Sequence, residues 1–170
     1  MINFFKRFVT PKAGIPLKWD DSETKLNLGC GRNYREGWSN WDTLDTIKTD
    51  ARVDVSRDPF PAPDEFFDRI YSNGLLEQIS ENEGLLHCMN ECHRVLKTEG
   101  TAIFVVPSSL FPLGFRDPHT MRHFIPDTFR YFVAGTKSYE RYGKLYGYLS
   151  WKSYTTATDE RGLMTAVLVK

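Results

Sequence analysis

A run of small residues at the end of a hydrophobic segment is the first feature of this sequence that suggests ligand chemistry. Residues 26–31 read LNLGCG, and Gly29 and Gly31 let the backbone approach a ligand without side-chain bulk. The acidic residue Asp42 ends the next apolar run. In open α/β folds the ligand lies over the carboxyl ends of the strands, where an aspartate accepts hydrogen bonds from both ribose hydroxyls. Together the two features predict a site for a ribose-bearing ligand.

The connection between these two features is too short for a helical crossover. Only six residues, 32–37, separate Gly31 from Trp38, whereas a crossover between parallel strands needs about a dozen or more. Dinucleotides rest their pyrophosphate on the amino terminus of that helix, so the short connection disfavours NAD. S-adenosylmethionine carries no phosphate and fits better. A degenerate site that binds nothing is the alternative.

A second group of reactive side chains lies in the aromatic segment 115–124. His119 or His123 is the candidate general base in this segment, and Arg116 or Arg122 is the candidate partner for an anionic acceptor. The aromatic residues of the segment would shield the site from water. The alternative is a segment that packs on its own aromatic side chains and leaves its charges in solvent.

Two clusters contain metal-ligating residue types, but neither has the pattern of a metal site. Asp117 and the two histidines that follow it lack a fourth ligand. Residues 87–93 hold two histidines and two cysteines that surround a predicted helix, and the apolar spacing places Cys92 in the core. Cys30 is interpreted as a small residue packed beneath the ligand rather than as a nucleophile. We therefore predict no metal ligand.

Apolar runs and breakers predict the elements that hold these residues in place. Strands at residues 25–28, 38–41, 51–55, 67–72 and 101–106 indicate a parallel sheet covered by helices. Ser80 and Glu83 have the spacing of a capping box and predict the start of a helix, and Gly100 marks its end. Residues 151–158 and 163–169, with a glycine-containing link, predict an antiparallel hairpin.

Four motifs, in order along the chain, resemble those of class I, type-11-like S-adenosylmethionine-dependent methyltransferases. They are LNLGCG at 26–31, GWSNWD at 37–42, FDRIYSNGLLEQI at 67–79 and RVLKTEG at 94–100. The resemblance covers about residues 25–107. It implies a Rossmann-like α/β fold with a mostly parallel seven-stranded sheet, a C-terminal antiparallel hairpin and, in this chain, a shortened first crossover.

The resemblance also implies roles for particular residues. Gly29 and Gly31 would lie against the methionine part of S-adenosylmethionine, Asp42 would hold its ribose, and Asp54 matches the acidic position near the adenine amino group. The full set of implied cofactor contacts is Asn27, Gly29, Cys30, Gly31, Asp42, Asp54, Ser72, Asn73 and Gly74. Two departures from the family pattern are Gln78, where relatives often carry histidine, and Thr-Glu-Gly at 98–100 in place of Pro-Gly-Gly.

Length and composition set the remaining expectations. The chain has 170 residues, 41% of them hydrophobic, which predicts one methyltransferase-like domain over 25–170 with an aromatic lid or acceptor segment at 108–150 and an N-terminal extension at 1–24. Its 22 basic and 22 acidic residues cancel, so no nucleic-acid partner is expected. Three cysteines without a disulfide framework, and an N-terminal apolar run too short to span a bilayer, predict a cytoplasmic protein without a membrane span.

The sequence thus predicts methyl transfer from S-adenosylmethionine to a small-molecule acceptor. The resemblance implies a metabolite or a sugar as that acceptor. Two alternatives belong to other classes: a catalytically silent binding module with the same fold, and a NAD-dependent oxidoreductase, which the short crossover disfavours.

Overall fold

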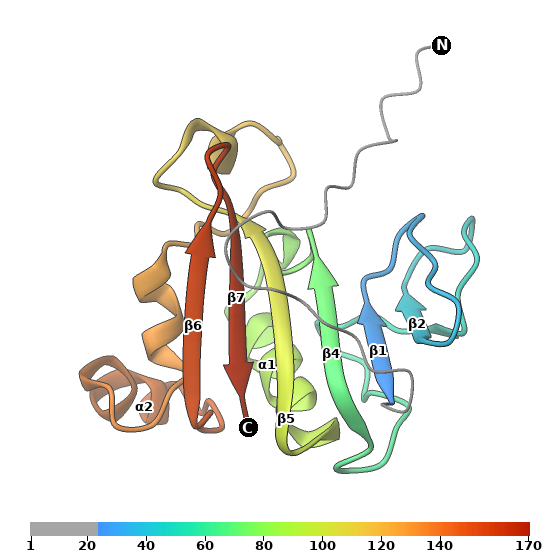
Figure 1. Cartoon of the computed structure of the whole chain (residues 1–170), viewed down its shortest axis with the longest axis horizontal. Helices are drawn as coiled ribbons and strands as arrows, with labels where there is room; N and C mark the ends of the chain where they lie inside the picture. Colours follow the sequence, from blue (N-terminus) through green and yellow to red (C-terminus); the bar gives the residue numbers. More distant parts are fainter. Residues whose placement is uncertain (1–23) are drawn as a thin grey trace.

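Seven strands form one sheet in the order β3-β2-β1-β4-β5-β7-β6 (Figure 1). The computed structural model describes residues 24–170, so the predicted N-terminal extension lies outside the described residues except for Thr24. The strands are β1 Lys25–Leu28, β2 Ser39–Asp42, β3 Ala51–Arg52, β4 Phe67–Asn73, β5 Leu96–Pro107, β6 Ser153–Thr158 and β7 Leu163–Val169.

The directions of the strands match the predicted fold. Neighbours from β3 through β2, β1 and β4 to β5 pair in parallel, while β7 runs antiparallel to both β5 and β6. The predicted C-terminal hairpin is therefore confirmed as β6 and β7. The parallel strands bring the ends of β1, β2 and β4 to one edge of the sheet, where the site residues meet.

The helix α1, Asn82–Val95, covers one face of the sheet and lies behind it in Figure 1. Its buried stripe includes Leu85, Met89 and Cys92, as the sequence spacing predicts. The predicted start and end of this helix were wrong in detail. Glu81 is the N-cap without a side-chain cap hydrogen bond, so the capping box does not form, and Gly100 lies inside β5 rather than at the helix end.

The main hydrophobic core lies between the sheet and α1. Trp41 makes edge-on contacts with Phe60 and Phe67, with ring centroids 5.6 and 5.5 Å apart. A smaller cluster on other strand positions contains Tyr71, Ile103 and Val105, and partly buried Trp38 packs against it. The large aromatic residues thus anchor β2 and β4, the strands on either side of β1, against the core.

Irregular turns occupy most of the chain between β5 and β6. They comprise the 3-10 turns η2 Pro112–Phe115 and η3 Pro126–Tyr131, the π-helical turn η4 Tyr139–Gly143 and the short helix α2 Lys144–Tyr146. Phe124, Phe129 and Phe132 from this region are buried in the main core, which fixes its second half to the domain. Phe115 and Met121 in the first half are exposed.

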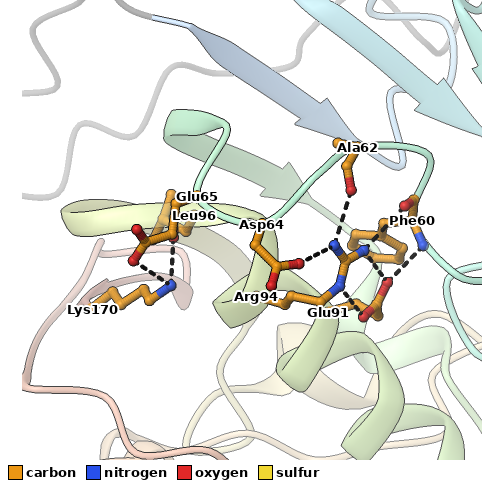
Figure 2. Close-up of polar contacts among 8 residues, drawn as sticks. All are labelled: Phe60, Ala62, Asp64, Glu65, Glu91, Arg94, Leu96 and Lys170. Carbon is orange, nitrogen blue, oxygen red and sulfur yellow. Dashed lines mark hydrogen bonds and ion pairs between the residues drawn. The ribbon is translucent and has the colours of Figure 1, made fainter.

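Arg94 of α1 ties the helix to the proline-rich loop before β4 (Figure 2). Its guanidinium pairs with Glu91 on the same helix and with Asp64, and it donates to the carbonyl oxygens of Phe60 and Ala62. The pKa of Glu91 is held below its usual value, chiefly by the hydrogen bonds from Arg94. These hydrogen bonds and ion pairs give a structural reason for Arg94 in the RVLKTEG motif.

None of the helices between Thr24 and Lys170 has both the length and the apolar character needed to cross a membrane.

Candidate active site

The glycine run after β1 forms a tight loop whose amides are already bonded within the protein. Gly29 and Gly31 adopt positive φ values of 66° and 51°, which glycine reaches without steric cost. The amides of Gly29 and Cys30 both donate to the Trp41 carbonyl, at 2.9 and 3.0 Å. The Gly31 amide donates to Asp42 Oδ2 at 2.8 Å. These three amides are therefore not free to cradle a phosphate, so the loop is unsuited to a pyrophosphate.

Asp42 ends β2 and is oriented by two backbone amides. Its Oδ2 accepts from Gly31, and its Oδ1 accepts from the Leu44 amide at 3.0 Å. Each carboxylate oxygen has a further lone pair, so both can still accept a hydrogen bond from a ligand hydroxyl. Cys30 lies close by and is only 2% exposed. Burial and, secondarily, the Asp42 charge raise the pKa of its thiol to about 11.

A buried polar network takes the place of a helix in the short first crossover. Asn40 of β2 is fully buried, and its Oδ1 accepts from Asn27 Nδ2 and the Arg35 amide, at 2.9 and 2.8 Å. Its Nδ2 donates to the carbonyls of Arg35 and Trp38 and to Asp50 Oδ2. Asn27, an implied cofactor contact, thus directs its amide into this network and does not line the pocket described next.

A pocket of about 300 Å³ opens at the carboxyl edge of the sheet, within the size range of small-molecule sites, roughly 300–1,000 Å³. Its walls come from the segments after four strands: Gly29, then Asp42 and Thr43, then 53–57, then Leu75 and 78–81. A Cβ on Gly29 would stand 3.0 Å from the Leu75 side chain, so only glycine fits there comfortably. The structure brings the predicted residues Gly29, Asp42 and Asp54 together at this pocket.

Asp54 lies on the wall that follows β3, but its side chain has local partners. Its Oδ1 accepts from the Ser56 hydroxyl at 2.6 Å and the Ser56 amide at 3.0 Å, and Oδ2 pairs with Arg57. These contacts, first among them the Ser56 hydroxyl, lower the pKa of Asp54. Asp54 therefore shapes the turn 54–58 as well as facing the pocket.

The three predicted cofactor contacts at the end of β4, residues 72–74, each have different neighbours. Ser72 is buried, and its hydroxyl has no hydrogen-bond partner. Asn73 acts on the neighbouring Tyr71, whose pKa burial raises and Asn73 lowers, with a net upward shift. Gly74 has a positive φ of 74°, and its carbonyl accepts from Gln78 Nε2 at 2.7 Å. Gln78, at the position where relatives often carry histidine, thus fixes the turn after β4 and lines the pocket.

The two candidate bases lie in the exposed half of the segment between β5 and β6. His119 is exposed, and its backbone amide donates to Asp117 Oδ1. His123 Nδ1 is 3.2 Å from the Ser109 hydroxyl, and its ring lies 4.9 Å from the Phe115 ring. Neither histidine lines the pocket beside Asp42.

Arg122 attaches this segment to the pocket rim. Its guanidinium donates to the carbonyls of Ile79 and Ser80 and to Asn82 Oδ1. The predicted role of Arg122 in holding an anionic acceptor is therefore replaced, in this conformation, by a structural one. Arg116 is exposed and keeps the predicted role open.

Glu77 is a buried titratable residue, next in sequence to the pocket-lining Gln78, that sequence reasoning missed. It sits in the 3-10 turn η1, Leu76–Gln78, directly after the β4 turn, and is only 6% exposed. Burial, reinforced by the Asp117 charge, raises its pKa to about 7. The one available signal was a glutamate flanked by apolar residues in the run Leu75–Ile79, a pattern that the sequence analysis treated only as part of a motif.

Comparisons with known proteins give a family match for part of this chain. Residues 33–104 match a family model described as a methyltransferase domain. The match begins just after the glycine run and ends inside β5. A search of curated protein sequences found no match.

Solved structures with the same fold are S-adenosylmethionine-dependent methyltransferases. One from Archaeoglobus fulgidus has a TM-score of 0.64 at 12% identity, over 87% of this chain and 86% of that chain. One from Methanosarcina mazei has a TM-score of 0.59 at 14% identity, over 89% of this chain and 92% of that chain. A third, from Thermotoga maritima, has a TM-score of 0.51 at 11% identity, over 86% and 81% of the two chains.

Proposed function

We propose that this chain transfers the methyl group of S-adenosylmethionine to a small-molecule acceptor, because residues 33–104 match a methyltransferase domain and the chain has the fold of S-adenosylmethionine-dependent methyltransferases. The observation that carries the proposal is Asp42 at the pocket, with both carboxylate oxygens oriented by backbone amides. An oriented carboxylate at the end of the second strand suits the two hydroxyls of a ribose.

The residues of the pocket fit this donor better than a dinucleotide. Asp42, Asp54 and Glu81 outnumber the single Arg57 on the pocket lining, which favours a cationic ligand over an anionic one. The bonded amides of the glycine run are consistent with a ligand that has no phosphate. Gly29 leaves room for backbone contact beside Leu75. When bound, the donor supplies an electrophilic methyl group on a sulfonium.

We assign the implied contacts by their places in the site. Gly29, Asp42 and Asp54 would contact the donor directly, with Asp42 at the ribose and Asp54 on the adenine side. Cys30 and Gly31 would shape the loop beneath it, as Asn27 does through Asn40. Ser72, Asn73 and Gly74 would form the floor by the methyl group.

The acceptor would enter from the side of residues 108–124. The exposed side chains of Leu110, Phe115 and Met121 offer apolar contact there, and Arg116 offers a positive charge. Methyl transfer is an in-line displacement, so the protein contributes mainly orientation and exclusion of water. His119 and His123 are candidate bases for an acceptor that keeps its proton.

A catalytically silent module is the second candidate, and the short first crossover favours it. Such a module would bind the donor weakly or not at all and would not transfer its methyl group. Incubation with methyl-labelled donor and panels of small metabolites and sugars separates the two, because only an enzyme transfers the label.

The decisive experiment is calorimetric titration of the whole chain with S-adenosylmethionine, S-adenosylhomocysteine and NAD. We expect heat of binding with the first two and none with NAD. Asp42→Ala should weaken binding of both by about tenfold or more, equivalent to about 1.4 kcal/mol. Absence of binding to both adenosyl compounds would overturn the proposal.

A matched control is Asp45→Ala, three residues further along the same loop. Asp45 is exposed, its carbonyl accepts from Arg52, and it does not line the pocket. The control should bind like the unmodified protein. Equal weakening in both variants would mean that general charge, rather than the placement of Asp42, governs affinity.

A further inference from the structure

The Glu77 side chain carries a buried oxygen with no hydrogen-bond partner. Its Oε2 is one of three such side-chain atoms among residues 24–170, together with the hydroxyls of Ser72 and Thr165. Leaving a buried polar group unsatisfied costs about 1–3 kcal/mol, and more for a charged one. Such a group in a native structure calls for a ligand or a chemical role.

Glu77 lies between the turn that ends β4 and the 108–124 segment, the two parts of the chain that the proposed function assigns to the donor methyl group and the acceptor. Its Oε1 is 3.6 Å from the point that a Cβ on Gly74 would occupy, so the carboxyl group borders the turn that ends β4. Its carbonyl accepts hydrogen bonds from the amides of Met121 and Arg122, at 2.8 and 3.0 Å. Glu77 is thus held against both the floor of the site and the 108–124 segment.

The charges around Glu77 keep it near neutrality. Burial disfavours its ionised form, and the Asp117 carboxylate, from the segment that covers it, acts in the same direction. Arg122 contacts Glu77 through its backbone amide, while its guanidinium is bound to Ile79, Ser80 and Asn82. A carboxyl group with a pKa of about 7 can accept a proton in neutral solution.

We propose that Glu77 is the general base that takes the proton from the methyl acceptor, a hydroxyl or an ammonium group. This inference rests on the proposed function. An ammonium group first gives its proton to Glu77, which frees the nitrogen lone pair, whereas a hydroxyl gives up its proton as it attacks. As the acceptor oxygen or nitrogen bonds to the methyl carbon, the sulfur–methyl bond breaks and its electron pair stays on sulfur. The acceptor's proton passes to Glu77 Oε2, which completes the balance of charge.

The position of Glu77 favours it over the two histidines. His119 and His123 lie on the exposed part of the 108–124 segment, and His123 is engaged by Ser109 and Phe115. Glu77 is buried, comes from the turn that ends β4 and has an unpartnered oxygen. A base must be shielded from water and lie near the acceptor; Glu77 is buried, and although it does not itself line the pocket, its neighbours Leu75 and Gln78 do.

Proton release on donor binding tests this role without knowledge of the acceptor. The positive sulfonium of S-adenosylmethionine would lower the pKa of a neighbouring carboxyl group, while the neutral sulfur of S-adenosylhomocysteine would not. A pKa near 7 that falls by one unit releases about 0.4 proton per bound molecule at pH 7. The measurement is titration calorimetry of the whole chain in two buffers of different ionisation enthalpy.

We expect Glu77→Gln to bind S-adenosylmethionine and to lose this release, while Glu83→Gln, an exposed glutamate on α1, retains it. His119→Gln and His123→Gln should also retain it. Unchanged release in Glu77→Gln, or its loss in either histidine variant, would overturn the assignment of Glu77. If no variant and no unmodified protein binds the donor, the proposed function fails instead.

If the Glu77→Gln variant does not fold, a second measurement on the unmodified protein tests the same proposal. The carboxyl carbon of Glu77 in the unmodified protein can be followed by NMR against pH, with and without S-adenosylmethionine. We expect a titration near neutrality that moves to lower pH when the donor binds. A titration that the donor does not move would overturn the proposal.

Discussion

A single buried carboxyl group makes the stability of this domain depend on pH. The pKa of Glu77 is raised from its usual 4.5 to about 7, chiefly by burial. The folded state therefore holds this proton more tightly than the unfolded state does. Its stabilising effect is complete below about pH 4.5 and is lost as the pH rises through about 7.

Glu77→Gln should remove this dependence, because glutamine has no ionised form. We expect the variant to exceed the unmodified protein in free energy of unfolding by up to about 3 kcal/mol at pH 8, and to be close to it at pH 5. Urea unfolding at the two pH values measures the difference. Glu83→Gln is the control, and parallel pH profiles for Glu77→Gln and the unmodified protein would contradict the prediction.

At the scale of elements, side-chain hydrogen bonds rather than a helix hold the connection between β1 and β2 in place. The amide nitrogen of Asn40 donates to two backbone carbonyls and one carboxylate, and its oxygen accepts from two amides. Tyr34 extends the network by donating to Asp50 Oδ1 at 2.7 Å. Such a network is strong when complete and costly when one member is removed.

Asn40→Leu should therefore cost more than its change in size suggests. It removes the Asn40 side-chain hydrogen bonds to the Asn27 amide, the Arg35 amide, two carbonyls and Asp50, and we expect a loss of about 3 kcal/mol in the free energy of unfolding. Donor affinity should fall with it, because the glycine run loses its support. Urea unfolding and calorimetry check both effects.

The control for this element is Asn33→Ala. Asn33 is exposed, and the network uses its carbonyl rather than its side chain. We expect a stability change within about 0.5 kcal/mol, as is usual for surface substitutions. A similar loss of unfolding free energy in both variants would contradict the prediction, because it would mean that any substitution in the crossover is destabilising and that Asn40 has no special role.

Across the whole molecule, the contacts of Arg94 join elements that are far apart in sequence (Figure 2). Through Glu91, Asp64 and two carbonyls, this side chain connects α1 to the loop that leads from the pocket wall to β4. Near it, Lys170 donates to the Leu96 carbonyl at 2.7 Å, which ties the end of β7 to the start of β5.

Arg94→Met should lower the free energy of unfolding by about 2 kcal/mol, because Glu91, Asp64 and two carbonyls each lose a charge-assisted hydrogen bond in a half-buried site. Lys152→Met is the matched control, since it removes an exposed ion pair with Glu99, which is worth at most about 1 kcal/mol. Thermal and urea unfolding give both values. An equal effect in the two variants would contradict the special role of Arg94.

The sheet, and the pocket at its carboxyl edge, were largely predictable from the sequence. A continuous apolar run at 101–106 predicted the second half of β5, and two β-rich runs joined by a link ending in Gly162 predicted the hairpin. Gly29 and Asp42 meet at one pocket because parallel strands end at the same edge of the sheet. Local patterns were sufficient in these cases because each element carries its own signal.

The features that depend on distant contacts were not predictable. The capping box at Ser80 does not form because the helix starts one residue too late for it: Glu81 is the N-cap, and Arg122, 42 residues away from Ser80, binds the Ser80 carbonyl and Asn82. Asn27 faces Asn40 rather than the ligand pocket because the short crossover needs a buried partner. The burial of Glu77 depends on the 108–124 segment, whose turns have no periodic pattern that would place them over η1.

The buried thiol of Cys30 has a consequence for the selectivity of alkylation. A thiolate beside a bound sulfonium would compete with the acceptor for the methyl group, because the thiolate is the nucleophilic form of cysteine. With a pKa of about 11, only about one Cys30 side chain in ten thousand is ionised at pH 7. The same Asp42 that suits the ribose helps to keep this thiol protonated. The loop thereby protects itself from methylation by its own donor.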